Sequence, residues 1–222
     1  MRRARILLWA LALAVAAVSP AHATSVTVVI SGTWDSVIDN ASVTNGSLVV
    51  GGGFTATLVF DDAAADLDPS ANVGDYLLPA ATTDLVLSSG SYAFTLLSTS
   101  SVSLGIDNNV GGQDGFGFFA EHFTTSGPLV SGASTGYGYA NPALFDNSQT
   151  AHSSDDLTAL PWDASAYDNT NFYFLIAVLG KGSNRFIELS GTITGLAVLP
   201  EPSSWALLAL AGAAITASRF RG

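Results

Sequence analysis

The feature that most limits the fold of this chain is a period-two alternation of apolar and polar residues that recurs between residues 25 and 196. In the first such segment, SVTVVISG from residue 25, the side chains of Val26, Val28 and Ile30 share one face, as in a strand half-buried on a sheet. Similar segments alternate with turns rich in Gly, Asn, Asp and Ser, and no long 3.6-residue helical period occurs before residue 205. The sequence therefore predicts an all-β fold.

The same pattern predicts further strands. They are Ser47–Phe60 (one or two strands broken at a triple glycine), Leu85–Ser88, Tyr92–Leu97, Ser101–Ile106, Phe116–Glu121, Phe172–Leu179 and Arg185–Leu196. The residues at 89–91 and 180–184 suit hairpin turns. The stretch 155–168 could hold a short helix, which Pro161 would limit.

The spacing of these strands indicates two packed antiparallel sheets, that is, a β-sandwich or jelly roll. A β-helix or other solenoid would need an internal repeat, and the chain shows no such period. One short motif that occurs twice is the tripeptide Ser-Gly-Thr, at residues 31–33 and 190–192. We interpret the two copies as parts of the first and last strands, which we expect to be neighbours.

The first 23 residues have the layout of a secretory signal peptide. Arginines at positions 2, 3 and 5 give a basic start, and an apolar run covers residues 6–18. That run is shorter than the about 20 residues that a membrane-spanning helix needs. Ala21 and Ala23 are the small residues of a cleavage site that follows Ala23. We therefore expect export by the general secretory route.

Charge and cysteine content exclude several classes of function. The chain has no cysteine, which excludes disulfide scaffolds, thiolate zinc sites and cysteine nucleophiles. Residues 24–199 hold two basic residues, Lys181 and Arg185, against seventeen acidic ones, because Glu201 alone of the eighteen lies outside that range. Such a surface repels nucleic acid and anionic lipid and attracts cations. We therefore expect no nucleic-acid partner.

Patterns that could support catalysis lack the context they need. GASTG at 132–136 fits the G-x-S-x-G pattern with Ser134 as nucleophile, but that motif works at a strand-to-helix turn, and YGYANP follows here. His122 and His152 have no partner at local spacing, and no two carboxylates stand out for glycoside hydrolysis. We expect a protein without catalytic activity, and a secreted hydrolase is the least favoured alternative.

Two loops carry oxygen side chains at spacings that calcium could use. In the first, the candidate ligands are Asp66, Asp68 and Asn72, although this loop lacks the turn glycine and bidentate glutamate of an EF-hand. In the second, the candidate ligands are Asp107, Asn109 and Asp114. Turns use Asp, Asn and Gly in any case, so solvated turns are the alternative interpretation of both loops.

Aromatic residues beside turns could stack on the faces of sugar rings. The candidates are Trp34, Tyr137, Tyr139 and Trp162. Core packing is the alternative explanation for the tryptophans. Together with the calcium loops, these rings make a calcium-dependent glycan-binding module the second hypothesis for function.

The C-terminal stretch PEPSSWALLALAGAAITASRFRG has three parts. Pro200, Glu201 and Pro202 form a stiff extended segment, because each proline fixes its own backbone and restricts the residue before it. Residues 205–217 are apolar and would form a helix of about 20 Å, shorter than the hydrocarbon core of about 30 Å. Arg219 and Arg221 suit the cytoplasmic side. We expect a short transmembrane helix that acts as a stop-transfer signal.

These three parts, combined with a signal peptide, resemble the PEP-CTERM sorting signal of Gram-negative bacteria. The resemblance implies that the secretion machinery exports the chain as an inner-membrane-anchored precursor. Exosortase, an integral-membrane cysteine transpeptidase, would then recognise the PEP motif and cut near it. The cargo would reach the cell envelope, the outer surface or an extracellular matrix rich in exopolysaccharide. The segments FTATLVFD, NVGDY and LSGTITGL at residues 54–61, 72–76 and 189–196, with residues 107–116, are similar to a recurrent β-rich cargo of this family.

The sequence thus predicts a signal peptide at 1–23, a β-sandwich domain at 24–199 and a sorting signal at 200–222. Within the sorting signal, the PEP motif is at 200–202, the apolar helix at 205–217 and the basic end at 219–221. The leading hypothesis for function is a non-catalytic structural or adhesive protein of an exopolysaccharide-rich envelope or biofilm. We expect no cofactor other than calcium.

Overall fold

The computed structural model describes residues 25–199 apart from 41, 43, 129–133 and 180–185. The predicted cleavage site at Ala21 and Ala23, the sorting signal at 200–222 and the two predicted terminal helices lie outside them. Within the described part, no helix is long and apolar enough to cross a membrane.

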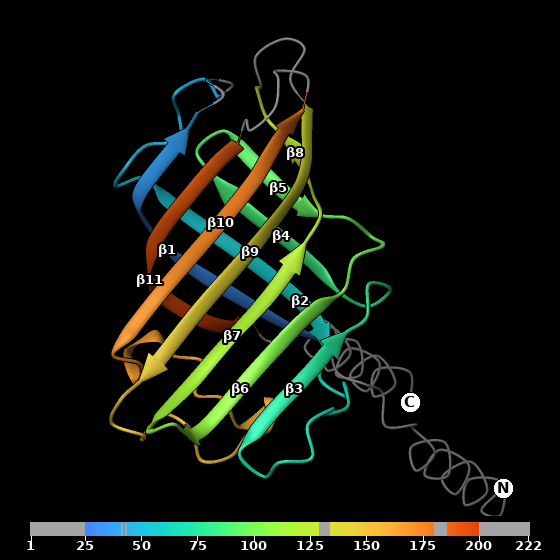
Figure 1. The fold of residues 1–222 in the computed structure, drawn as a ribbon, viewed down its shortest axis with the longest axis vertical. Coiled ribbons are helices and arrows are strands. Elements are labelled where there is room, and N and C mark those ends of the chain that lie inside the picture. The colour runs from blue at the N-terminus through green and yellow to red at the C-terminus, as the bar shows by residue number, and fades with distance from the viewer. Residues whose placement is uncertain (1–24, 41, 43, 129–133, 180–185, 200–222) are drawn as a thin grey trace, which may run out of the picture.

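The strands of the described residues form one antiparallel sheet (Figure 1). They are β1 Ser25–Asp39, β2 Gly53–Asp61, β3 Val73–Leu78, β4 Asp84–Ser89, β5 Tyr92–Leu96, β6 Val102–Val110, β7 Gln113–Glu121, β8 Phe123–Ser126, β9 Ser134–Asp146, β10 Asn169–Leu179 and β11 Phe186–Leu199. Their order in space is β3-β6-β7-β9-β10-β11-β1-β2-β4-β5-β8. Non-consecutive neighbours such as β9 beside β7 and β11 beside β1 tie distant parts of the chain together.

The all-β antiparallel class is confirmed, and the sheet is continuous where two separate sheets were expected. In Figure 1 a front half, β3 to β10 in spatial order, faces a rear half, β2 to β8, and β11 and β1 connect them. These two connecting strands are 14 and 15 residues long, and their pairing is interrupted by register shifts at residues 31/32 and 34/36 of β1. Such bulges bend a strand instead of ending it, so the hydrogen bonding continues around the curl. The single curled sheet is therefore sandwich-like in its layering.

A single hydrophobic core fills the space between the two halves. At one point in it Trp34 stacks on Phe54 with ring centroids 4.2 Å apart, and Phe172 contacts both rings. The indole N–H of Trp34 donates to Ser89 Oγ at 2.8 Å, and that hydroxyl donates to the carbonyl oxygen of Gly53 at 2.9 Å. Trp34 is 1% exposed, so this candidate for sugar stacking is a core residue.

The two Ser-Gly-Thr tripeptides pair with each other in the centre of the sheet. Thr33 lies opposite Thr192, and Trp34 lies opposite Gly191. A Cβ atom added to Gly32 would clash with the carbonyl oxygen of Thr192, and one added to Gly191 would clash with that of Thr33. Only glycine allows so close an approach at both positions. The expectation that the first and last strands are neighbours is confirmed.

Other elements differ from the expectations. The alternation does not predict β3, β8 or β9, and β9 includes Gly138, Asn141 and Pro142, residue types that strands usually lack. Strands β6 and β7 extend into the expected 107–115 loop and leave a tight turn at residues 111–112. The stretch 155–168 holds two short 3-10 turns, Leu157–Ala159 and Ala164–Ala166, where a short helix was expected.

Candidate ligand-binding face

The first predicted calcium loop consists of turns that lie beside the edge strand β3. Asp66 Oδ1 accepts the backbone amides of Asp68 and Asp75, both at 2.9 Å. The carbonyl oxygen of Asn72 accepts the amide of Asn108 at 2.9 Å. The structure therefore brings this loop against the second predicted calcium loop, although the carboxylate of Asp66 is engaged by the chain itself.

The second predicted calcium loop belongs to a buried hydrogen-bond network. Asp114 is fully buried, and its two carboxylate oxygens accept the amides of Asn109 at 2.7 Å and His152 at 2.9 Å. The ring nitrogens of His152 lie 2.9 Å from the carbonyl oxygen of Asp107 and 2.9 Å from the hydroxyl of Tyr167. Both nitrogens of the imidazole and both oxygens of the carboxylate thus have partners within the protein.

A second buried carboxylate, Asp146, lies directly opposite Asp114 on the neighbouring strand. It accepts the Ser148 hydroxyl at 2.6 Å and the backbone amides of residues 148, 150 and 151 at 2.8, 2.7 and 2.9 Å. These hydrogen bonds, with the Ser148 hydroxyl foremost, hold the pKa of Asp146 well below its ordinary value. Burial, followed by the charges of the two carboxylates, raises the pKa of Tyr167. The network fixes the segment that follows β9.

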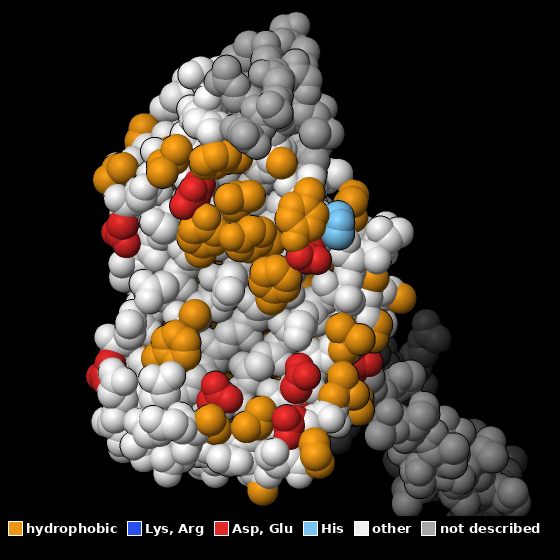
Figure 2. Space-filling view, in the orientation of Figure 1, with side chains coloured by type: hydrophobic (Ala, Val, Ile, Leu, Met, Phe, Trp, Pro, Cys, Tyr) orange, Lys and Arg blue, Asp and Glu red, His pale blue; other side chains and the backbone are white. Residues whose placement is uncertain are grey.

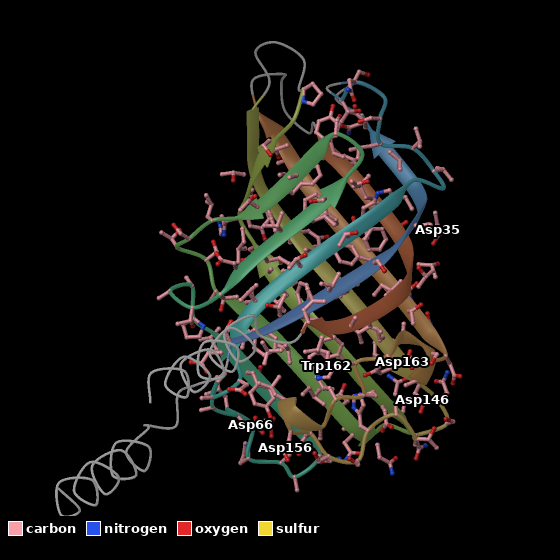
Figure 3. The ribbon with its side chains drawn as sticks, turned by 180° about the vertical axis from the view of Figure 1, so that it is seen from behind. Asp35, Asp66, Asp146, Asp156, Trp162 and Asp163 are labelled. Carbon is pink, nitrogen blue, oxygen red and sulfur yellow. The ribbon has the colours of Figure 1, made fainter. Side chains whose placement is uncertain are left out.

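No group of three or more His, Asp or Glu side chains in the described residues is arranged to hold a metal ion. Figure 3 labels four aspartates at this end of the molecule: Asp66, Asp146, Asp156 and Asp163. The carboxylates of Asp66, Asp146 and Asp163 accept nearby backbone amides. That of Asp156 accepts the Ser154 hydroxyl at 3.3 Å. Calcium binding at either loop stays a prediction.

The residues considered for catalysis lie apart: His152 belongs to the buried network described above, whereas Ser134 and His122 lie at strand ends. Ser134 begins β9 and pairs with Leu179 of β10, and β9 continues from there to Asp146, so its backbone is extended rather than an elbow before a helix. His122 lies between β7 and β8 with a φ of 66°, and its ring contacts Tyr137 edge-on at 5.1 Å. His122 therefore adjoins an exposed aromatic surface.

A groove of about 280 Å³, here called the outer groove, crosses the outward face of the front half. Its floor is a row of small residues that pair across three strands: Gly105 of β6, Gly117 of β7 and Ala143 of β9. Phe119 and Phe145 line it from opposite sides of that row. Figure 2 shows the hollowed stretch in the middle of this face. Strands lie about 4.8 Å apart, so the floor extends over about 10 Å.

Aromatic side chains gather on the same face next to the outer groove. Tyr139 contacts Phe119 at 5.6 Å and stacks on Tyr173 at 5.5 Å between ring centroids. The side chains of Phe119 and Tyr137 are 39% and 46% exposed. Figure 2 shows this apolar cluster with acidic side chains among it. An exposed aromatic patch beside a groove is characteristic of a binding surface.

Polar side chains complete the face. Asp107 and Asn141 line the outer groove, and Glu121 accepts a hydrogen bond from the Tyr137 hydroxyl. Burial raises the pKa of Asp107 above its ordinary value, and the nearby His152 offsets only part of that rise. The groove thus offers apolar ring faces, a carboxylate and an amide, the mixture that suits hydroxyl-rich ligands with flat apolar faces.

Sequence reasoning identified part of this face. Tyr137 and Tyr139 were candidates and lie on it, whereas Trp162 packs edge-on against Phe116 at 5.5 Å. Phe119 and Tyr173 were missed, because their outward direction depends on a strand register that the sequence alone does not give.

The comparisons with known proteins give no relative for this chain. No protein-family model, no curated protein and no solved structure matches it. Functional inference therefore starts from the geometry of the outward face.

Proposed function

We propose that this chain is an exported, non-catalytic protein of the cell envelope or extracellular matrix that binds polysaccharide through the outer groove. The observation that carries the proposal is the small-residue floor of the groove, with Phe119 and Tyr139 beside it. A sugar polymer lying across the strands would stack on these rings, and its hydroxyls would meet Asp107 and Asn141. Binding of this kind makes the protein structural or adhesive within a biofilm.

Delivery to that location is proposed from the two ends of the chain. The signal-peptide layout of residues 1–23 favours export by the secretion machinery. The resemblance of residues 200–222 to the PEP-CTERM signal favours processing by exosortase. In that scheme Pro200, Glu201 and Pro202 are recognised, while Arg219 and Arg221 orient the precursor in the inner membrane. The cargo is the β-domain, which we place among the sandwich-like or jelly-roll-like folds.

The groove can be filled without disturbing the sheet, and that gives the test. A Cβ atom at Gly105 would meet nothing within 4 Å, whereas one at Gly117 would meet the carbonyl oxygen of Pro142 at 2.8 Å. Valine suits a strand, so Gly105→Val should fold normally. We expect it to bind about tenfold more weakly than wild type to the oligosaccharides that wild type retains on a glycan array.

The matched control is Gly53→Val in β2, where an added Cβ atom would meet only the carbonyl oxygen of Gly32 at 3.9 Å. It should bind as wild type does. Retention of binding by Gly105→Val, or the absence of any bound glycan for wild type, would contradict the proposal. EDTA distinguishes this proposal from the calcium-dependent alternative. Binding by the outer groove alone should persist in EDTA, whereas calcium-dependent binding should be lost.

A further inference from the structure

The described surface carries no lysine or arginine side chain. All seven basic residues of the chain lie at positions 2, 3, 5, 181, 185, 219 and 221, outside the described residues. Figure 2 accordingly shows acidic side chains on the outward face and no basic ones. Because residues 24–199 hold seventeen acidic against two basic residues, a ligand on this face meets a net negative potential, which disfavours uronic-acid, sulfated and phosphorylated polymers.

Two carboxylates stand at the ends of one row of the aromatic cluster. The pairing Glu121–Tyr139–Leu175–Glu188 runs straight across β7, β9, β10 and β11 on the outward face. Three strand spacings separate the glutamates, or about 14 Å. The row therefore places a negative charge on each side of an apolar, aromatic centre.

Tyrosine rings lie next to both glutamates. The Tyr137 hydroxyl donates to Glu121, and Tyr173 stacks on Tyr139 and lies near Glu188. Burial, followed by the neighbouring Tyr139 and Glu188 side chains, raises the pKa of Tyr173, so its hydroxyl stays protonated and the ring neutral. Neutral aromatic faces beside carboxylates attract ammonium groups, by cation–π attraction and by direct charge pairing.

We propose that the polysaccharide bound by this face is one that carries protonated primary amines, such as a partly N-deacetylated hexosamine polymer. This inference rests on the proposed function and names the ligand class of the same face. Ammonium groups of the polymer pair with Glu121 and Glu188 among the tyrosine rings. Neighbouring sugar rings lie against Phe119 and in the outer groove.

The test compares two hexasaccharides that differ only in their amines. Binding of the glucosamine hexamer and of the N-acetylglucosamine hexamer to the purified full-length protein is measured by titration calorimetry, at a pH where the free amines are protonated. We expect the glucosamine hexamer to bind about tenfold more tightly. Its binding should weaken as salt is added, because exposed charge pairs are screened.

Single substitutions distinguish binding by the Glu121–Glu188 row from attraction by the acidic surface in general. Glu188→Gln keeps the size of the side chain but removes the charge, and we expect about tenfold weaker binding of the glucosamine hexamer. The control Asp84→Asn removes one exposed charge from β4 in the rear half and should leave the affinity unchanged. Glu121→Gln should behave like Glu188→Gln.

The possible failures are distinguishable. Equal binding of the two hexamers, with no effect of Glu188→Gln, would overturn the amine specificity and leave the polysaccharide proposal standing. A hexalysine peptide that binds as tightly as the glucosamine hexamer and is insensitive to Gly105→Val would also overturn it, since any cation would then suffice. If neither hexamer binds, the inference fails, and the glycan array decides separately on the proposed function.

Discussion

At the scale of single residues, the hydroxyl of Ser89 governs how Trp34 can be buried. It accepts a hydrogen bond from the indole N–H and donates one to the carbonyl oxygen of Gly53. Ser89→Ala leaves a buried N–H without an acceptor, which costs about 1–3 kcal/mol. We expect the free energy of unfolding to fall by that amount, measured by urea denaturation.

The control uses the partner of this hydrogen bond. In a Trp34→Phe background the N–H is already absent, so Ser89→Ala should cost clearly less than it does in wild type. An equal cost in both backgrounds would mean that the serine acts through the carbonyl oxygen of Gly53 alone.

At the scale of elements, the segment after β9 is held by the carboxylate of Asp146, whose pKa is below the ordinary value of 3.8. A lowered folded-state pKa adds stability that is complete above the unfolded pKa and is lost as the pH falls toward the folded one. The melting temperature of wild type should therefore drop below about pH 4 more steeply than that of Asp146→Asn. Scanning calorimetry from neutral pH downward measures both slopes.

Comparison with the asparagine variant removes the contribution of other acids. Hydrogen bonds from Ser70 and Ser165 lower the pKa values of Asp68 and Asp163, but these carboxylates are present in both proteins. If the melting temperatures of the two proteins fall equally steeply with pH, protonation of Asp146 is not what destabilises the fold.

The strands that follow strict alternation could be predicted from sequence, whereas β9 could not. The hairpin of β4 and β5 was expected nearly where it lies, because its apolar residues recur at every second position. The expected strand Ser25–Gly32 is the first part of β1, which continues to Asp39. Strand β9 carries Gly138 and Pro142, which read as loop, and forms because β7 and β10 pair with it on both sides. The outer groove was missed for a related reason, since its floor combines single small residues from three strands.

At the scale of the whole molecule, the proposed processing makes a prediction about mass. The protein released from the envelope should lack the residues before Thr24 and those after the PEP motif, because signal peptidase and exosortase would remove them. Intact-mass spectrometry of the released protein measures both ends. A released species that still carries residues 219–222 would contradict exosortase processing.

The pairing of β1 with β11 also has a mechanical consequence. Leu199, the last residue of β11, lies opposite Thr27, and β11 is hydrogen-bonded to β10 on its other side. A tether attached after Leu199 would pull β11 along its own axis, so two ladders of hydrogen bonds would carry the load together in shear. A polymer held on the front half would apply the opposing force within the same continuous sheet. If the end is anchored and the polymer is bound as proposed, this pairing would transmit tension between them with little extension.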